Sequence, residues 1–378
     1  MLITRAGLIA GLAAGAVALT ACGSDSNPSS TTTNGAGGGS ASSASTSTSS
    51  ASCASGSLKA EGSTAQKNAM DQWITDYQNQ CSGATITYNG TGSGAGVSNF
   101  IAKQDNFAGS DSALDPKKDE PTKATTACGS QAIDLPMVTG PIAIAYKLNG
   151  VSDLTLTPQL ITKIFLGKIT TWNDPAIKAV NSGANLPSTK ITVFYRSDSS
   201  GTTQNFERYL AANDPAEFTS TPDKDSSKAG FAGQGKTGSQ GVQQAISSTE
   251  GAVGYVEWSY AVSGNLATAK IDNGSGAVDL TADSAGAAVS AAKIASNGGQ
   301  DLTLKLAYDT KASGAYPIIL VTYEIVCSKY SDPKIGSLVK SFLNYTVGAG
   351  QSALKDLGYA PLPTDIQSKV QAAVNSIS

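Results

Sequence analysis

Three loops rich in glycine, serine and threonine carry the residues of this sequence that could do chemistry. They occupy residues 62–65, 90–96 and 196–202. Each follows an apolar run that predicts a strand and precedes an amphipathic run that predicts a helix. The start of a helix offers unpaired N–H groups, the positive end of the helix dipole and a nearby hydroxyl. One such loop is most often an ordinary helix cap, but three of them together with Arg196 favour a site for an oxyanion.

The elements that would position these loops alternate between strand and helix from residue 57 onwards. Strands are predicted at residues 58–60, 84–88, 133–138, 142–146, 191–195, 252–258 and 318–326, with a break at residues 139–141. In the first predicted helix, Trp73 and Tyr77 share an apolar face, so both are expected in the core. Residues 117–120 are expected to form a solvated turn. The alternation predicts an α/β fold whose ligand loops lie at the carboxyl ends of mostly parallel strands.

The N-terminus has the layout of an exported lipoprotein. Arg5 precedes a short apolar stretch at residues 6–19, and small residues lead to Cys22. The stretch is too short to span a bilayer comfortably, so a transmembrane helix is the weaker interpretation, and an ordinary signal peptide is the other alternative. We expect a signal peptide at residues 1–22 with lipidation of Cys22, followed by a disordered linker at residues 23–55. This long tether favours a Gram-positive envelope.

Four further cysteines remain for the exported body, and three pairings of them are possible. We favour Cys53–Cys81, because a βα unit would bring these two together. The remaining pair, Cys128–Cys327, would then join distant parts of the chain. Zinc binding by these thiols is disfavoured because no CxxC spacing occurs.

The composition excludes several classes of function. A net charge of −3 provides no positive field for nucleic acid, so no nucleic-acid partner is expected. The chain contains no histidine, which removes Ser-His-Asp catalysis and His-ligated zinc. Residues 90–95 imitate a dinucleotide-binding fingerprint, but an exported protein has no ready supply of that cofactor, so no cofactor is expected.

Several ordered motifs resemble the ligand loops of one family. Gly62-Ser63-Thr64, residues 88–94, residues 108–111 and residues 196–202 are similar, in this order, to those of the phosphate-binding receptor of the high-affinity phosphate ABC transporter. The similarity runs from about Leu58 to near the C-terminus. It implies a two-lobed periplasmic-binding-protein-like fold of type II, with two mixed sheets joined by a two-stranded hinge. Lobe I would comprise residues 56–140 and 317–378, and lobe II residues 141–316.

The resemblance also implies which residues touch the phosphate. Hydroxyl or N–H donors would come from the three loops, Arg196 would pair with the anion, and Asp198 would hold its guanidinium from behind. The expected phosphate-binding residues are Ser63, Thr64, Ala65, Ser93, Asp111, Arg196, Ser200, Gly201 and Thr202. Ala65 departs from the family pattern, because some members carry a bulky aromatic there, and the apolar wall must then come from elsewhere.

Asp111 is the residue that would decide the choice of anion. A carboxylate repels an anion unless the anion carries a proton that it can donate to the carboxylate. Phosphate near neutral pH carries such a proton and sulfate does not. Asp111 should therefore favour phosphate over sulfate.

These observations predict a monomeric, non-enzymatic receptor that captures inorganic phosphate and delivers it to the permease subunits of an ABC importer. Two alternatives remain. A secreted phosphatase or hydrolase could use Ser63, Ser93 or Ser200, although none has an evident base. The second alternative is a receptor for another oxyanion. Asp111 argues against ligands that are fully deprotonated.

Overall fold

The computed structural model describes residues 53–295 and 299–378. The predicted signal peptide, Cys22 and most of the predicted linker lie outside the described residues. At the end of that linker, Cys53 is already tied to the folded body through a disulfide with Cys81.

A nine-stranded mixed sheet forms the centre of the described part, in the order β2-β1-β3-β14-β4-β8-β6-β7, with β9 also paired to β4. Its strands are β1 (Gly56–Gly62), β2 (Ala84–Gly90), β3 (Phe107–Ser110), β4 (Ala132–Lys147), β6 (Thr192–Arg196), β7 (Gln234–Lys236), β8 (Ala252–Glu257), β9 (Ala267–Thr268) and β14 (Ile319–Cys327). Smaller sheets contain β5 (Thr155–Leu156), β10 (Lys270–Asp272), β11 (Ala277–Val278), β12 (Lys293–Ile294) and β13 (Leu304–Lys305). Parallel pairs lie at both ends of the large sheet, and β14, β4 and β8 form an antiparallel centre.

Strand β4 runs through the whole centre of the sheet. It pairs with β14 as far as Pro141, opposite Ile319, and with β8 from Ile142, opposite Glu257. The predicted break at residues 139–141 is therefore wrong. Proline is tolerated here because the strand changes partner at this residue, so the missing N–H interrupts neither ladder. We call β2-β1-β3-β14 with the first part of β4 the first half-sheet, and the rest of β4 with β8-β6-β7 the second half-sheet.

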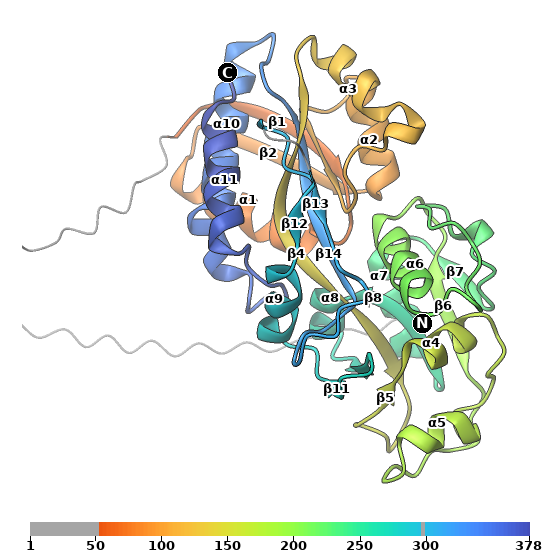
Figure 1. Ribbon diagram of the computed structural model, residues 1–378. Helices are drawn as coiled ribbons and strands as arrows, with labels where there is room; N and C mark the ends of the chain where they lie inside the picture. Colours follow the sequence, from red (N-terminus) through yellow and green to blue (C-terminus); the bar gives the residue numbers. More distant parts are fainter. Residues whose placement is uncertain (1–52, 296–298) are drawn as a thin grey trace, which may run out of the picture. The chain divides into compact units, whose positions relative to one another are not determined.

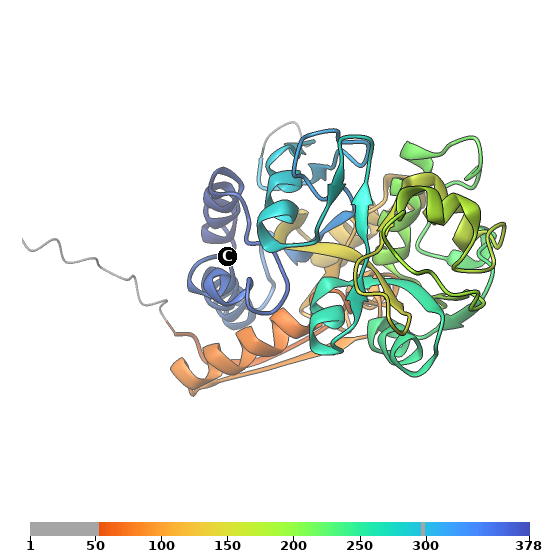
Figure 2. The ribbon, with the colours of Figure 1, turned by 90° about the horizontal axis from the view of Figure 1, so that it is seen from below.

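Helices cover both faces of the first half-sheet (Figure 1). On one face α1 (Lys67–Gln80), α10 (Pro333–Val347) and α11 (Thr364–Asn375) bury a core with the strands, and this core contains Trp73 and Tyr77 as predicted. On the other face lie α2 (Ser93–Ile101) and α3 (Glu120–Cys128), with a smaller core around Phe100. Seen from below, the orange α1 and the blue α10 and α11 lie on the left, and the yellow-green helices of the second half-sheet lie on the right (Figure 2).

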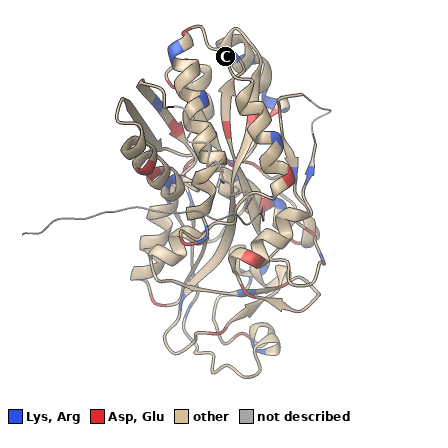
Figure 3. Cartoon of the chain, turned by 90° about the vertical axis from the view of Figure 1, so that its left-hand side faces the viewer, with Lys and Arg blue, Asp and Glu red and all other residues tan. Residues whose placement is uncertain are grey.

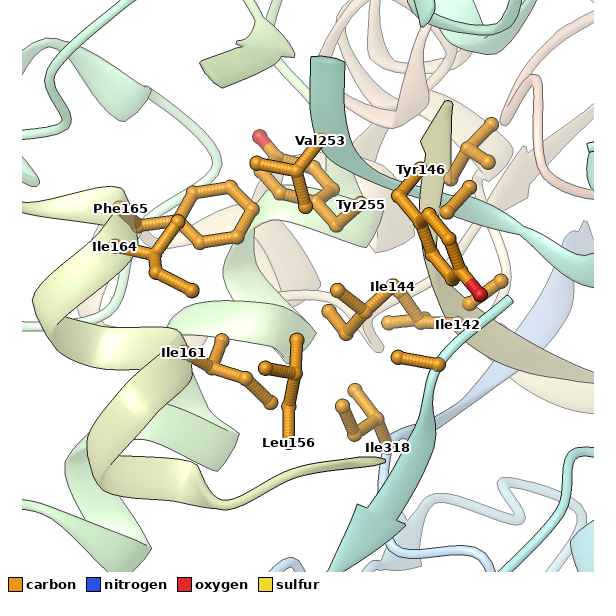
Figure 4. Packing of buried hydrophobic residues seen from close by; sticks show 14 of the residues in the cluster. Ile142, Ile144, Tyr146, Leu156, Ile161, Ile164, Phe165, Val253, Tyr255 and Ile318 are labelled. Carbon is orange, nitrogen blue, oxygen red and sulfur yellow. The ribbon is translucent and has the colours of Figure 1, made fainter. Parts of the chain in front are cut away.

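The second half-sheet has its own core. Its helices are α4 (Pro158–Phe165), α5 (Pro175–Val180), α6 (Gly201–Asn213), α7 (Gly238–Ser248) and α8 (Trp258–Ser263). In Figure 4 the side chains of Ile144, Ile161, Phe165 and Tyr255 point toward one another, and the Phe165 and Tyr255 rings lie 5.9 Å apart. Trp172 is fully buried in this core and donates its indole N–H to the Gly251 carbonyl at 3.0 Å. It therefore packs against protein in the core of the second half-sheet.

The remaining helices connect these parts. They are α9 (Ala282–Ser290) and the short 3-10 turns η1 (Pro116–Lys118), η2 (Ser226–Lys228) and η3 (Ala349–Ala353). None of the helices in the described ranges is both long and apolar enough to span a bilayer.

Both predicted disulfides are present, Cys53–Cys81 and Cys128–Cys327. The first closes β1 onto the end of α1, and the second ties the end of α3 to the end of β14. Basic and acidic residues are interspersed on the side of the chain seen in Figure 3. The chain as a whole carries a net charge of −3, so an anion must be attracted by local donors.

Candidate functional site

The three predicted loops come together at the carboxyl ends of β1, β2 and β6. Two of them lead into a helix at once: Gly92 is the N-cap of α2, and Ser200 is the N-cap of α6. Ser200 accepts the Thr203 N–H at 3.2 Å. The first loop differs, because α1 begins only at Lys67.

Glycines let the second and third loops touch. The Gly94 N–H donates to the Ser199 carbonyl at 3.1 Å. A Cβ on Gly92, whose φ is 97°, would lie 2.8 Å from Asp198 Oδ2 and 2.9 Å from the Ser199 carbonyl oxygen. Since real Cβ atoms do not approach that closely, only glycine fits between these loops.

Asp111 follows β3 and lies among hydroxyl groups. Its Oδ1 accepts from Ser63 and from Thr322, the latter at 2.8 Å, and its Oδ2 accepts from Ser93 at 3.1 Å. The residue is 3% exposed. Burial raises the pKa of Asp111 to about 6, and the nearby Glu257 acts in the same direction, while Ser63, Thr322 and Arg196 oppose it. Asp111 is thus a carboxylate at neutral pH that has little access to water.

Arg196 is the buried cation of the site, and it is 2% exposed. Its Nε donates to Asp198 Oδ1 at 2.7 Å and its Nη2 to Asp198 Oδ2, while Nη1 donates to Ser239 Oγ at 3.0 Å. Burial pushes the pKa of Asp198 upward, but the Arg196 guanidinium and the Gly238 N–H outweigh it and hold that pKa below its usual range. Asp198 therefore holds the Arg196 guanidinium through two hydrogen bonds.

All residues predicted to contact phosphate are buried, and hydrogen bonds link them across the sheet. Ser93 Oγ accepts the Gly201 N–H at 3.2 Å, which joins the second loop to the third. Thr64 Oγ1 and Ser239 Oγ lie 2.7 Å apart, which joins the first loop to α7. Thr202 donates its hydroxyl to Glu257.

Sequence reasoning missed Ser239, Glu257 and Thr322. Ser239 contacts both Thr64 and Arg196, and Glu257 is fully buried at the end of β8, where no described group donates to its Oε2. Glu257 lies at the end of a predicted strand, as the predicted loops do, and this position could have marked it as a candidate site residue. Nothing local marks Ser239 or Thr322, because each reaches the site only through the topology of the sheet.

The turn at Ala65 is held by tyrosines from distant segments. The Tyr260 hydroxyl donates to the Thr64 carbonyl at 3.1 Å, and the Tyr359 hydroxyl donates to the Ala65 carbonyl at 2.6 Å. Both tyrosine side chains are buried. Their hydroxyls therefore fix the backbone of the turn from two other segments of the chain.

This arrangement combines one guanidinium, several hydroxyls and helix N-termini with buried carboxylates, so it can surround an oxyanion that also carries a proton. Within the described ranges no cluster of Asp, Glu or Cys is arranged to hold a metal ion.

Comparison with known proteins agrees with a site that binds an oxyanion. Residues 47–349 match the PBP superfamily domain. Over the full length of both chains, the sequence is 44% identical to phosphate-binding protein PstS3 of Mycobacterium bovis. It is 32% identical to phosphate-binding protein PstS of Pasteurella multocida, over 80% of this chain and 85% of the other. The structure of a high-affinity periplasmic phosphate-binding protein, PfluDING, bound with phosphate, superimposes with a TM-score of 0.69 at 24% identity, covering 84% of this chain and 93% of that one.

The fold and site therefore define a two-lobed periplasmic-binding-protein-like α/β protein. The chain belongs to the PstS family of phosphate-binding proteins.

Proposed function

We propose that this chain captures inorganic phosphate between its two half-sheets and delivers it to an ABC importer. The observation that carries the proposal is the position of Asp111. It is a buried carboxylate that accepts from hydroxyls and lies near enough to Arg196 for the two charges to interact. A carboxylate in a site of donors suits an anion that brings its own proton. Phosphate does so at neutral pH, and its P–OH would donate to Asp111.

The remaining residues have roles in the same proposal. Arg196 pairs with the phosphate charge, with Asp198 fixing its orientation. The other donors are hydroxyls and backbone N–H groups of Ser63, Thr64, Ala65, Ser93, Ser200, Gly201 and Thr202. The hydroxyls now bonded to one another or to carboxylates can rotate toward a bound anion, because a hydroxyl both donates and accepts.

The two lobes follow from the partner change in β4. We infer boundaries at residues 140/141 and 316/317, so that lobe I carries Ser63, Ser93 and Asp111 and lobe II carries Arg196 and α6. The ligand would stabilise the closed arrangement because it contacts both lobes.

The context of this activity is extracytoplasmic. We propose a lipid anchor at Cys22 on the outer face of a Gram-positive cell membrane, a monomeric receptor and a membrane permease as its partner. We also propose that the chain is not an enzyme, since it contains no histidine to activate its serines. A phosphoester that stays intact on prolonged incubation supports this, and turnover would contradict it.

Calorimetric titration of the detergent-solubilised full chain, stripped of phosphate, tests the main proposal. Tight one-to-one binding of phosphate without a sulfate signal is expected. Binding of both anions would keep the anion site and refute the role of Asp111. Binding of neither would refute the proposed function.

A further inference from the structure

Lys224 is a buried cation outside the proposed phosphate contacts. It lies in the loop between α6 and η2, two residues before η2 begins, and is 4% exposed. Its Nζ donates no hydrogen bond to any described residue, and the nearest ion-pair partner is Glu120 Oε2 at 4.0 Å. Lysine is almost never buried in this way without a partner, because removing an ammonium from water costs free energy.

The ammonium lies among carboxylates of the first half-sheet. Burial lowers the pKa of Lys224 and the nearby Lys118 charge lowers it too, whereas the charges of Glu120, Asp111 and Asp134 raise it. These three carboxylates come from α3, the segment after β3, and β4. The lysine therefore reaches from one half of the molecule into acidic surroundings of the other.

A second ion pair of the same loop also joins the two halves of the molecule. Asp223 Oδ2 lies 3.0 Å from Lys118 Nζ, on the turn just before Glu120. Two consecutive residues of opposite charge, Asp223 and Lys224, thus face the oppositely charged Lys118 and Glu120. Residues 117–120 were predicted to be a solvated turn, but Glu120 is only partly exposed and its Oε2 accepts the Asp115 N–H at 2.8 Å. The expected solvation is wrong for Glu120, because it faces the other half of the molecule.

The backbone and flanking residues of this loop also hold the third anion loop. The Lys224 carbonyl accepts the N–H of Ser200, the N-cap of α6, at 2.9 Å. Ser226 donates its hydroxyl to the Arg196 carbonyl at 2.6 Å. The segment that carries Lys224 is therefore bonded at both ends of the Arg196–Ser200 stretch.

We propose that Lys224 is a positioning residue for phosphate capture: its ammonium docks against the carboxylates of the first half-sheet while its carbonyl holds Ser200 in place. The anion loop is then correctly placed only when the two halves meet, and release of phosphate requires the ammonium to leave its acidic surroundings. This inference rests on the proposed function. An apolar side chain of similar length would fill the space but would remove the Lys224 charge from beside Glu120 and Asp134.

The test compares Lys224→Met with Lys228→Met, an exposed lysine of the same segment. Release of radiolabelled phosphate from the full chain into excess unlabelled phosphate gives the dissociation rate, and mixing at varied concentration gives the association rate. We expect Lys224→Met to release phosphate at least about tenfold faster with association changed less than about threefold, because the contact forms on closure. Lys228→Met should behave as wild type.

A purely structural role would lower the melting temperature of the phosphate-free chain and alter both rates. Lys224→Met with a wild-type melting temperature and fast release supports positioning, whereas wild-type release overturns it. If Lys224→Met does not fold, Glu120→Gln decides from the opposite half: faster release supports the inference and unchanged release overturns it. Failure of the wild type to bind phosphate would instead refute the proposed function.

Discussion

Replacing Asp111 by asparagine separates its two effects, on stability and on the choice of anion. Burial raises the pKa of Asp111 from its ordinary value of 3.8 to about 6. One pKa unit corresponds to about 1.4 kcal/mol, so ionised Asp111 costs the ligand-free fold up to about 3 kcal/mol at pH 8. This cost is absent below the unfolded-state pKa, where the side chain is protonated in both states. It grows as the pH rises from the unfolded-state pKa to the folded-state pKa and is fully present above the folded-state pKa.

Asp111→Asn should therefore stabilise the phosphate-free chain by about 1–3 kcal/mol at pH 8 and by much less at pH 4. The lower value of this stabilisation allows for an unfavourable contact of the new side chain. The asparagine NH2 group would face Ser93 Oγ, which already accepts the backbone N–H groups of residue 111 and Gly201. Urea unfolding at both pH values measures the effect. Asp119→Asn, on an exposed turn, is the control and should change little at either pH.

The same variant should lose its choice of anion. The amide oxygen still accepts from phosphate, so phosphate binding weakens only moderately, while the amide N–H can donate to sulfate. Selectivity of roughly 10⁴–10⁵ in a well-built polar site should fall by at least about 100-fold. Calorimetry with both anions is the assay. Unchanged stability together with unchanged selectivity would refute both the cost of the buried charge and the role of Asp111 in choosing the anion.

Other predictions follow from neighbouring contacts. Wild-type chain should begin to bind sulfate as the pH falls below about 6, because protonated Asp111 can donate; titrations at pH 8 and pH 5 would reveal it, and rejection at both would contradict it. Arg196→Lys keeps the charge but loses the forked contact with its carboxylate, so phosphate affinity by calorimetry should fall roughly 100-fold. Ser239→Ala removes a hydroxyl that contacts both halves, and the dissociation constant should rise about tenfold, whereas no change would exclude it from the site. Replacing Cys128 and Cys327 by alanine opens a link across 199 residues, and urea unfolding should show a loss of about 5 kcal/mol by the chain-entropy argument.

The sequence by itself determined the features that depend on local pattern. Apolar periodicity located most strands and the helices that carry the loops, and the glycines of residues 90–96 indicated the loop that precedes α2. The residue type of Asp111 led to the hypothesis that the bound anion carries a proton. Such features are readable because strand and helix periods, caps and side-chain chemistry act over a few neighbouring residues.

Tertiary structure decided which distant residues complete the site. Ser239 and Thr322 lie 175 and 211 residues from their partners Thr64 and Asp111, and their own segments carry no signal for an anion. Pro141 looked like a break until β4 was found to change partners there. Lys224 lies between two aspartates in sequence, and nothing in its own segment marks it as buried. Its burial depends on packing against the other half of the molecule, and such packing is a property of the assembled sheet that no short stretch of sequence contains.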